Sequence, residues 1–454
     1  MILERKLYNK LLVWKRDSQG RTALLIEGAR RVGKSTIVEE FGSREYRTHL
    51  IIDFAKAAPE VRDLFVRYRE DLDTFFAYLS AYYAVPFYPR DTLIVFDEVQ
   101  RFPPARELVK YLVADGRYDY VETGSLISLK ANVADIVIPS EEHREAMEPL
   151  DFEEFLWATG DVALAELIRS ARATLTPLPD ALHRKAERLF REYLLVGGMP
   201  QAVVQYLDGK DFGKVDDVKR DILALYRDDV SKYAGGQAAK VRRLIDAIPG
   251  QLSKHEKKFT LASADPHART ETYSDAFGWL DEARMVNLCH NATDPSVALP
   301  LTEDRGSFKC YLADTGLLVT QAFAARTATS DETYRAILFD KLSVNEGMLV
   351  ENAVAQQLRA GGDKLLFYSR YDRQDAAGNI EIDFLVVREY ADAGMKPRVS
   401  PVEVKSTKNY GTKSLDKFRA RFGSRVGTEY VLHPRQLKVD GRRIYLPLYM
   451  AHCL

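Results

Sequence analysis

The sequence has little cysteine, no long hydrophobic run and almost no net charge. Its three cysteines, Cys289, Cys310 and Cys453, have neither metal-ligand nor redox spacing, so we expect free thiols in a reducing compartment. No run of about 18 apolar residues occurs, which argues against a transmembrane helix, and the start of the chain lacks the apolar core of a signal peptide. These absences predict a cytoplasmic protein with no membrane partner.

The formal net charge of −1 gives no overall attraction to nucleic acid, so a surface that binds DNA or RNA must be local. Two segments carry enough local positive charge to be candidates for such a surface. Residues 240–258 hold six Lys or Arg against two acidic residues, and 405–425 hold seven against one, with Tyr410, Phe418 and Phe422 between them. Both segments are candidate contacts for DNA or RNA, and the alternative for each is a solvated basic helix.

The length of 454 residues is too great for one ordinary core, and 29% charged with 46% apolar residues is typical of soluble globular domains. The pattern along the chain predicts an α/β class with four segments. These are a parallel-sheet domain over 1–150, a helical lid over 151–220, a winged-helix-like domain over 221–335 and a smaller α/β domain over 336–454.

The first motif with recognisable chemistry is "GARRVGKS", residues 28–35, which follows an apolar strand and precedes a helical pattern. In this context the glycines allow consecutive backbone N–H groups to surround phosphate oxygens, and the positive end of the helix adds to the field. Lys34 would reach the terminal phosphates, and Ser35 would ligate Mg²⁺. The expected nucleotide-binding residues are Gly28, Arg30, Arg31, Gly33, Lys34, Ser35 and Thr36.

A second motif, "TLIVFDEVQ" (92–100), is an apolar strand that ends in Asp97 and Glu98. Carboxyl ends of buried parallel strands are where open α/β sheets place their ligands. Asp97 is suited to hold magnesium, and Glu98 to orient the attacking water. In "YDYVETGSLISL" (118–129), Thr123 and Ser125 are candidate sensors of the γ-phosphate, although such a turn is also ordinary loop chemistry.

These motifs, with "PLDFEEFLWATG" (149–160), resemble bacterial and archaeal ATPases of the AAA type whose C-terminal half is a domain of unknown function. The resemblance implies ATP and Mg²⁺ as cofactors. It implies catalytic roles for Lys34, Glu98 and Ser125 and metal ligation by Ser35 and Asp97. Such ATPases often complete their site with a neighbour's arginine, so an oligomer stays open. Arg30, Arg31 and Arg144 are candidates for that role, and a charged surface residue is the alternative for each.

The middle of the chain is predicted to be mainly helical. Gly197 and Gly198, followed by Pro200, are expected to end one helix and open the next. Helical patterns over 239–259 and 270–291, followed by a strand over 307–318, give the element order of a winged helix. That module either binds nucleic acid or serves as a lid or dimerisation element.

Near the C-terminus, "SPVEVKST" (400–407) places Glu403 and Lys405 on one face of an apolar strand. Upstream, Asp383 lies on another apolar strand and Glu351 on a helix expected to be amphipathic. Helix-Glu, strand-Asp and strand Glu-x-Lys is the order of the PD-(D/E)XK nuclease core, which this segment resembles. The resemblance implies a second divalent metal held by Glu351, Asp383 and Glu403, with Lys405 catalytic, in a site either active or retired.

The resulting hypothesis is a Mg²⁺-dependent ATPase whose nucleotide cycle controls a C-terminal nuclease-like domain that acts on nucleic acid. The alternative is a nucleotide-dependent switch or scaffold for a protein partner, with an inert nuclease-like fold. A third, weaker hypothesis is a P-loop kinase for a small molecule, which the adjacent Asp97 and Glu98 disfavour because they suit hydrolysis.

Overall fold

The computed structural model describes residues 2–124, 141–254, 258–261, 270–323, 331–332, 334, 346–371, 378–388 and 398–454. The chain divides into two compact units, each with its own set of contacts. Unit 1 comprises Met1–Glu148 with Glu282–Arg284, and unit 2 comprises Pro149–Asp281 with Met285–Leu454. The finer divisions at 220 and 335 stay predictions.

Unit 1 is built on a five-stranded parallel sheet with the strand order β2-β3-β4-β1-β5. The strands are β1 (Ala23–Gly28), β2 (Thr48–Asp53), β3 (Thr92–Asp97), β4 (Asp119–Gly124) and β5 (Glu142–Met147). β1 and β4 are buried along their whole length and β3 along nearly all of it, as strands covered on both faces must be. The predicted parallel sheet of an α/β domain is therefore confirmed.

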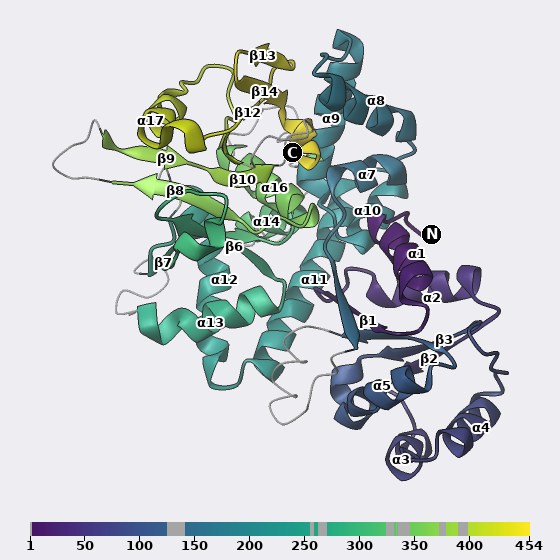
Figure 1. Cartoon of the computed structure of the whole chain (residues 1–454). Helices are drawn as coiled ribbons and strands as arrows, with labels where there is room; N and C mark the ends of the chain where they lie inside the picture. The colour runs from purple at the N-terminus through teal and green to yellow at the C-terminus, as the bar shows by residue number, and fades with distance from the viewer. Residues whose placement is uncertain are drawn as a thin grey trace. The chain divides into compact units, whose positions relative to one another are not determined.

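Helices cover both faces of this sheet (Figure 1). α3, α4 and α5 pack with one face into a single apolar cluster in which Phe65 makes edge contacts with Phe54, Phe75 and Phe96. α1 and α2 contact each other and the sheet on the opposite side. The helices are α1 (Lys6–Ser18), α2 (Lys34–Glu45), α3 (Pro59–Arg67), α4 (Leu72–Tyr83) and α5 (Pro103–Asp115).

Unit 2 begins with helices, as predicted from the sequence. They are α7 (Phe152–Ala158), α8 (Val162–Thr174), α9 (Asp180–Val196), α10 (Pro200–Leu207), α11 (Phe212–Tyr233), α12 (Ala238–Leu252) and α13 (Thr270–Glu282). α9 ends directly before Gly197, and α10 starts at Pro200, which confirms the predicted break. α11 runs without interruption through residue 220. No helix in the described parts of the chain is both long and apolar enough to cross a membrane.

Two mixed sheets follow, with the strand orders β7-β6-β8-β9 and β10-β11-β12-β14-β13. The first contains β6 (Val286–Ala292), β7 (Glu303–Leu312), β8 (Leu366–Arg370) and β9 (Ile380–Ile382). The second contains β10 (Phe384–Arg388), β11 (Arg398–Val404), β12 (Glu429–His433), β13 (Lys438–Asp440) and β14 (Arg443–Pro447). The strand predicted over 307–318 as the wing of a winged helix corresponds to β7, which pairs with β6. The helix predicted over 270–291 was wrong from Val286 onward, where the chain forms β6. The sheet of β6 and β7 also contains β8 and β9 from the C-terminal segment.

The described parts of unit 2 also contain the helices α14 (Thr315–Ala322), α16 (Glu346–Ala360) and α17 (Lys413–Phe422). α16 was expected to be amphipathic, but its residues from Met348 to Leu358 are all buried. Its polar side chains satisfy backbone groups of neighbouring segments. Asn352 bonds both the N–H and the carbonyl of Leu312, and Gln357 accepts from the N–H of Phe152. A helix with many polar side chains can therefore lie in the interior of the unit, because those side chains are hydrogen-bonded.

Short 3-10 turns lie at η1 (Val99–Arg101), η2 (Gly235–Gln237), η4 (Leu299–Thr302), η6 (Gly423–Arg425) and η7 (Leu448–Cys453).

Candidate nucleotide-binding site

The loop between β1 and α2 holds the side chain of Lys34 inside its own turn. The ammonium of Lys34 donates to the carbonyl of Gly28 at 2.9 Å and to that of Ala29 at 3.0 Å. Gly33 precedes the helix with φ +104°, a conformation that favours glycine. A side chain at Gly28 would bring its Cβ within 2.4 Å of the Met147 carbonyl oxygen. Both glycines are therefore required by the backbone.

Three oxygen-bearing side chains meet at the carboxyl ends of β3 and β4 and the start of α2. The Ser35 hydroxyl donates to Asp97 Oδ2 at 2.9 Å, and the Thr123 hydroxyl donates to Asp97 Oδ1. β4 lies between β1 and β3, which places Thr123 between the two motifs. A hydroxyl and a carboxylate that face each other are the hard oxygen ligands that Mg²⁺ prefers, so these residues fit that ion. Ser125 lies outside the described residues.

Glu98 is held in an unusual backbone conformation beside Asp97. Its φ of +52° is in the left-handed region, which costs a non-glycine residue about 1 kcal/mol or more. The Gln100 amide donates to Glu98 Oε2 at 2.6 Å, and Arg101 lies 3.8 Å from the same oxygen. Gln100 was not predicted. The sequence "DEVQ" contains this glutamine two residues after Glu98. The direction of its side chain, however, is set by the 3-10 turn at η1, which the sequence pattern did not predict.

Burial changes the charge behaviour of Lys34. Loss of water around the ammonium lowers the pKa of Lys34 to about 8, while the carboxylates of Glu98 and Asp97 oppose that shift. A bound polyphosphate would add negative charge beside this ammonium and so favour its protonated form. The site is therefore electrostatically suited to an anion.

The other predicted nucleotide contacts differ in their surroundings. Arg31 is exposed with φ +70°, and Thr36 is exposed in the first turn of α2. Arg30 is half-buried in the same loop. Arg144 lies on β5, where it pairs with Glu142 at 2.8 Å. Of the three candidate arginines, Arg30 and Arg31 are the two that lie in the phosphate loop itself.

Comparison with protein families assigns this part of the chain. Residues 20–156 match the model of the AAA domain. Unit 1 carries an AAA-type P-loop ATPase domain. The remainder matches two domains of unknown function, DUF8612 over residues 187–328 and DUF4143 over residues 346–450. A comparison with curated proteins finds none that matches.

Solved structures similar to the chain include the following three. The first is a Walker-type ATPase of Pyrococcus abyssi, 15% identical over 70% of this chain and 96% of the other, with a TM-score of 0.40. The Aeropyrum pernix ORC1 protein in complex with DNA is 11% identical over 71% and 93%, with a TM-score of 0.26. Drosophila ORC bound to DNA is 13% identical over 71% and 95%, with a TM-score of 0.22. At these TM-scores none of them supports a conclusion about this chain.

The predicted C-terminal site residues lie in two ion-paired groups within unit 2. Glu351 and Asp383 both contact the ammonium of Lys309, at 3.2 and 3.4 Å. Glu403 and Lys405 pair with each other at 2.8 Å. Within the described ranges, no group of three or more His, Cys, Asp or Glu side chains is arranged to hold a metal ion. The predicted second metal is therefore without support, and Lys309 was missed because it lies on β7, outside the nuclease-like pattern.

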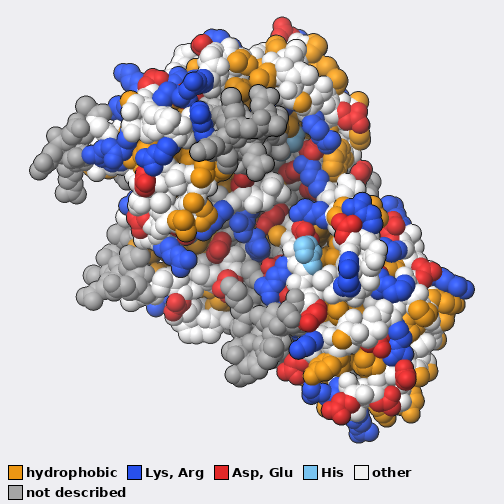
Figure 2. Space-filling view, viewed as in Figure 1, with side chains coloured by type: hydrophobic (Ala, Val, Ile, Leu, Met, Phe, Trp, Pro, Cys, Tyr) orange, Lys and Arg blue, Asp and Glu red, His pale blue; other side chains and the backbone are white. Residues whose placement is uncertain are grey.

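Some cations of the two basic segments have partners within the chain. In 405–425, Arg419 pairs with Glu429, and Arg425 pairs with Asp294 at 2.8 Å. In 240–258, the ammonium of Lys240 donates to the Thr272 carbonyl. On the face shown in Figure 2, blue Lys and Arg side chains lie interspersed with red Asp and Glu side chains.

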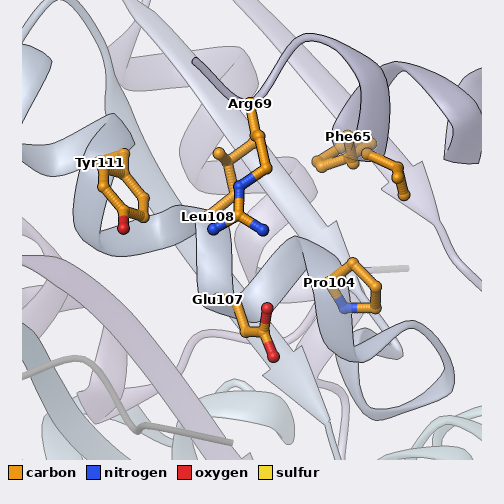
Figure 3. Close-up of a pocket in the computed structure, with 7 residues that line it drawn as sticks. Phe65, Arg69, Pro104, Glu107, Leu108 and Tyr111 are labelled. Carbon is orange, nitrogen blue, oxygen red and sulfur yellow. The ribbon is translucent and has the colours of Figure 1, made fainter.

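A small pocket of about 130 Å³ lies on unit 1 between α3 and α5, away from the phosphate loop (Figure 3). Its lining includes the apolar side chains of Phe65 and Leu108 and the polar side chains of Arg69, Glu107 and Tyr111. None of the predicted site residues lines it.

Proposed function

We propose that the protein is a Mg²⁺-dependent ATPase that hydrolyses ATP at the loop between β1 and α2. The observation that carries this proposal is the convergence of Ser35 and Thr123 on the carboxylate of Asp97, next to the half-buried side chain of Lys34. Elements from three parts of unit 1 bring these groups together. The match of residues 20–156 to the AAA domain supports the same activity.

Each side chain has a distinct proposed role. Lys34 and the loop N–H groups would bind the terminal phosphates of ATP. Ser35 and Asp97 would hold Mg²⁺, which, when bound, offsets negative charge on those phosphates. Glu98 would accept the proton of the attacking water, with Gln100 fixing the direction of its carboxylate. Thr123 would hold Asp97 in place, and Ser125 stays the proposed γ-phosphate sensor.

Two substitutions separate binding from hydrolysis. Glu98→Gln keeps the size of the side chain and removes its basicity, so we expect ATP binding close to wild type and phosphate release slower by about 100-fold or more. Lys34→Ala should weaken binding of a fluorescent ATP analogue as well. If Lys34→Ala hydrolysed ATP at the wild-type rate, the site assignment would be wrong. Phosphate transfer to an acceptor other than water would instead favour a kinase.

We further propose that the nucleotide cycle controls the C-terminal segment of unit 2, which has the element order of a PD-(D/E)XK nuclease. Support comes from the succession of α16, β8, β9 with β10, β11, α17 and β12, with Glu351 on α16, Asp383 between β9 and β10, and Glu403 on β11. The nuclease-like fold and its control by ATP rest on this order and on the resemblance of the sequence.

Contact with nucleic acid is the proposed output of this segment. Lys408, Lys413 and Arg421 are exposed around α17 and could face a phosphate backbone. Binding of labelled DNA and RNA should then weaken steeply with salt, and Lys408→Gln with Lys413→Gln should reduce the slope by about two units. Binding that is absent or independent of salt would favour the alternative, a nucleotide-dependent switch for a protein partner.

A further inference from the structure

One ammonium lies at the centre of the C-terminal acidic cluster. The side chain of Lys309, on β7, is 1% exposed, and its Nζ lies 3.2 Å from Glu351 Oε1, 3.2 Å from Glu381 Oε1 and 3.4 Å from Asp383 Oδ1. The three carboxylates come from α16, from β9 and from the junction of β9 with β10. The ring of Phe367 lies 5.2 Å from the same nitrogen. The ammonium is therefore enclosed by carboxylates and an aromatic face.

The carboxylates keep Lys309 charged in spite of its burial. Three carboxylate oxygens, from Glu351, Glu381 and Asp383, lie within 3.4 Å of its Nζ and supply opposite charge at short range. A buried charge is tolerated only when it is paired and hydrogen-bonded. Lys309 meets that condition through three partners, so it is a permanent cation of the fold.

The same oxygens are the ones that a divalent metal would need. A metal in this place would take carboxylate oxygens at about 2.0–2.6 Å, and it would face the positive charge of Lys309 at short range. Several of the carboxylates in and beside the cluster have a further partner. Asp383 Oδ2 accepts the N–H of Val404 at 2.9 Å, the Glu351 Oε1 that contacts Lys309 also accepts the Tyr311 hydroxyl at 2.5 Å, and the neighbouring Glu403 pairs with Lys405.

We infer that Lys309 is a built-in cation that takes the place of a divalent metal in the nuclease-like site, so that this site binds no Mg²⁺ or Mn²⁺. The cluster ties β7 to α16 and β9, and the segment it stabilises acts by binding rather than by metal-dependent cleavage. Lys309 lies in the residues that match DUF8612, whereas Glu351, Glu381 and Asp383 lie in those that match DUF4143. The inference rests on the nuclease-like part of the proposed function and not on ATP hydrolysis.

Binding of Mn²⁺ to the full chain without nucleotide, measured by the EPR signal of free Mn²⁺, tests this inference. Wild type and Asp383→Asn should bind the same number of ions, because the cluster takes none. Any bound ion should be lost in Asp97→Asn, which removes the N-terminal ligand. A tightly bound Mn²⁺ that Asp383→Asn loses and Asp97→Asn keeps would overturn the inference, and this outcome is distinct from failure of the ATPase assignment.

Removal of the lysine gives the complementary test. Lys309→Met keeps the length of the side chain and leaves the carboxylates without their cation, so it should gain one Mn²⁺ that Lys309→Met with Asp383→Asn does not bind. Its melting temperature should fall without metal and recover with Mn²⁺. Lys364→Met, which removes an exposed partner of Glu303, is the matched control and should gain no ion.

A folded Lys309→Met variant that binds no additional Mn²⁺ would contradict the inference. If that variant did not fold, the number of Mn²⁺ ions bound by wild type and by Asp383→Asn would test the inference without it. Cleavage assays add a second readout, because the inference predicts no Mn²⁺-dependent cleavage of DNA or RNA by the wild-type chain, with or without ATP. Cleavage abolished by Asp383→Asn would overturn it.

Discussion

The side-chain amide of Gln100 donates a 2.6 Å hydrogen bond to the carboxylate of Glu98, two residues earlier in the chain. This bond spans the turn between β3 and η1, where Glu98 has a φ of +52°. It fixes the direction of the side chain that is proposed to accept a proton from water. Gln100 is therefore proposed as a positioning residue for Glu98.

Gln100→Leu should lower kcat for ATP hydrolysis by about tenfold, because a hydrogen bond to a charged group contributes roughly 1.5–3 kcal/mol. KM for ATP should change little, since Gln100 makes no proposed contact with the nucleotide. Steady-state kinetics of phosphate release measure both constants. A rise in KM with unchanged kcat would show that Gln100 acts on binding instead.

Thr123→Val should weaken the magnesium dependence of the ATPase. The substitution keeps the shape of the side chain but removes the hydroxyl that donates to Asp97 Oδ1. Asp97 then loses one of the bonds that hold it, and we expect the Mg²⁺ concentration for half-maximal activity to rise by about tenfold. Thr123→Ser should restore the wild-type value, and failure of that rescue would assign the effect to packing.

Nucleotide binding should depend on pH through Lys34. Its pKa of about 8 lies below the ordinary value, so the free protein loses this positive charge as the pH rises above about 8. Since ATP binds the protonated form, affinity should be greatest below that pH and fall by up to about tenfold for each further unit. Titration of a fluorescent ATP analogue across this range measures it. Lys34→Gln should bind weakly at every pH, and an equally steep decline in that variant would exclude Lys34 as the cause.

Glu122→Gln should stabilise unit 1 at neutral and alkaline pH. Glu122 is fully buried on β4, and burial together with the neighbouring Glu142 raises the pKa of Glu122 well above the ordinary value of 4.5. A group whose folded-state pKa is raised contributes its stability below the unfolded-state pKa and loses it as the pH rises. The variant should be more stable than wild type at about pH 8 and should gain much less near pH 4.5.

Hydrogen exchange of the β4 segment at the two pH values measures this gain without averaging over unit 2. Glu107→Gln on the exposed face of α5 is the control and should have no pH-dependent effect. Equal stabilisation of Glu122→Gln at both pH values would show that the carboxylate of Glu122 is not the titrating group.

Gly198→Ala should destabilise unit 2. The added Cβ would lie 2.1 Å from the carbonyl oxygen of Leu150, and a backbone atom cannot move away cheaply. We expect a loss of roughly 2–4 kcal/mol, seen as faster proteolysis of unit 2 and a lower melting temperature. Gly278→Ala in α13 is the matched control, since no atom lies within 4 Å of its Cβ. It should be neutral or stabilising by up to about 1 kcal/mol.

The sequence by itself determined three strands of the sheet of unit 1, β1, β3 and β4, and the position of its phosphate loop. "GARRVGKS" and "TLIVFDEVQ" are each a strand followed by the residues at its carboxyl end, so the local pattern places Lys34 and Asp97 at the same edge of a parallel sheet. The break at Gly197 and Gly198 was also predicted, because a glycine pair followed by proline ends a helix through local backbone preference.

Only the tertiary structure decided the surroundings of these residues. The direction of Gln100 depends on the turn at η1, and α16 is buried on all sides because β6, β7, β11 and α14 pack around it. Lys309 reaches Glu351 over 42 residues of sequence and Asp383 over 74. Hydrophobic periodicity reports which face of one element is apolar, whereas an ion cluster made from distant strands is fixed only when the sheets assemble.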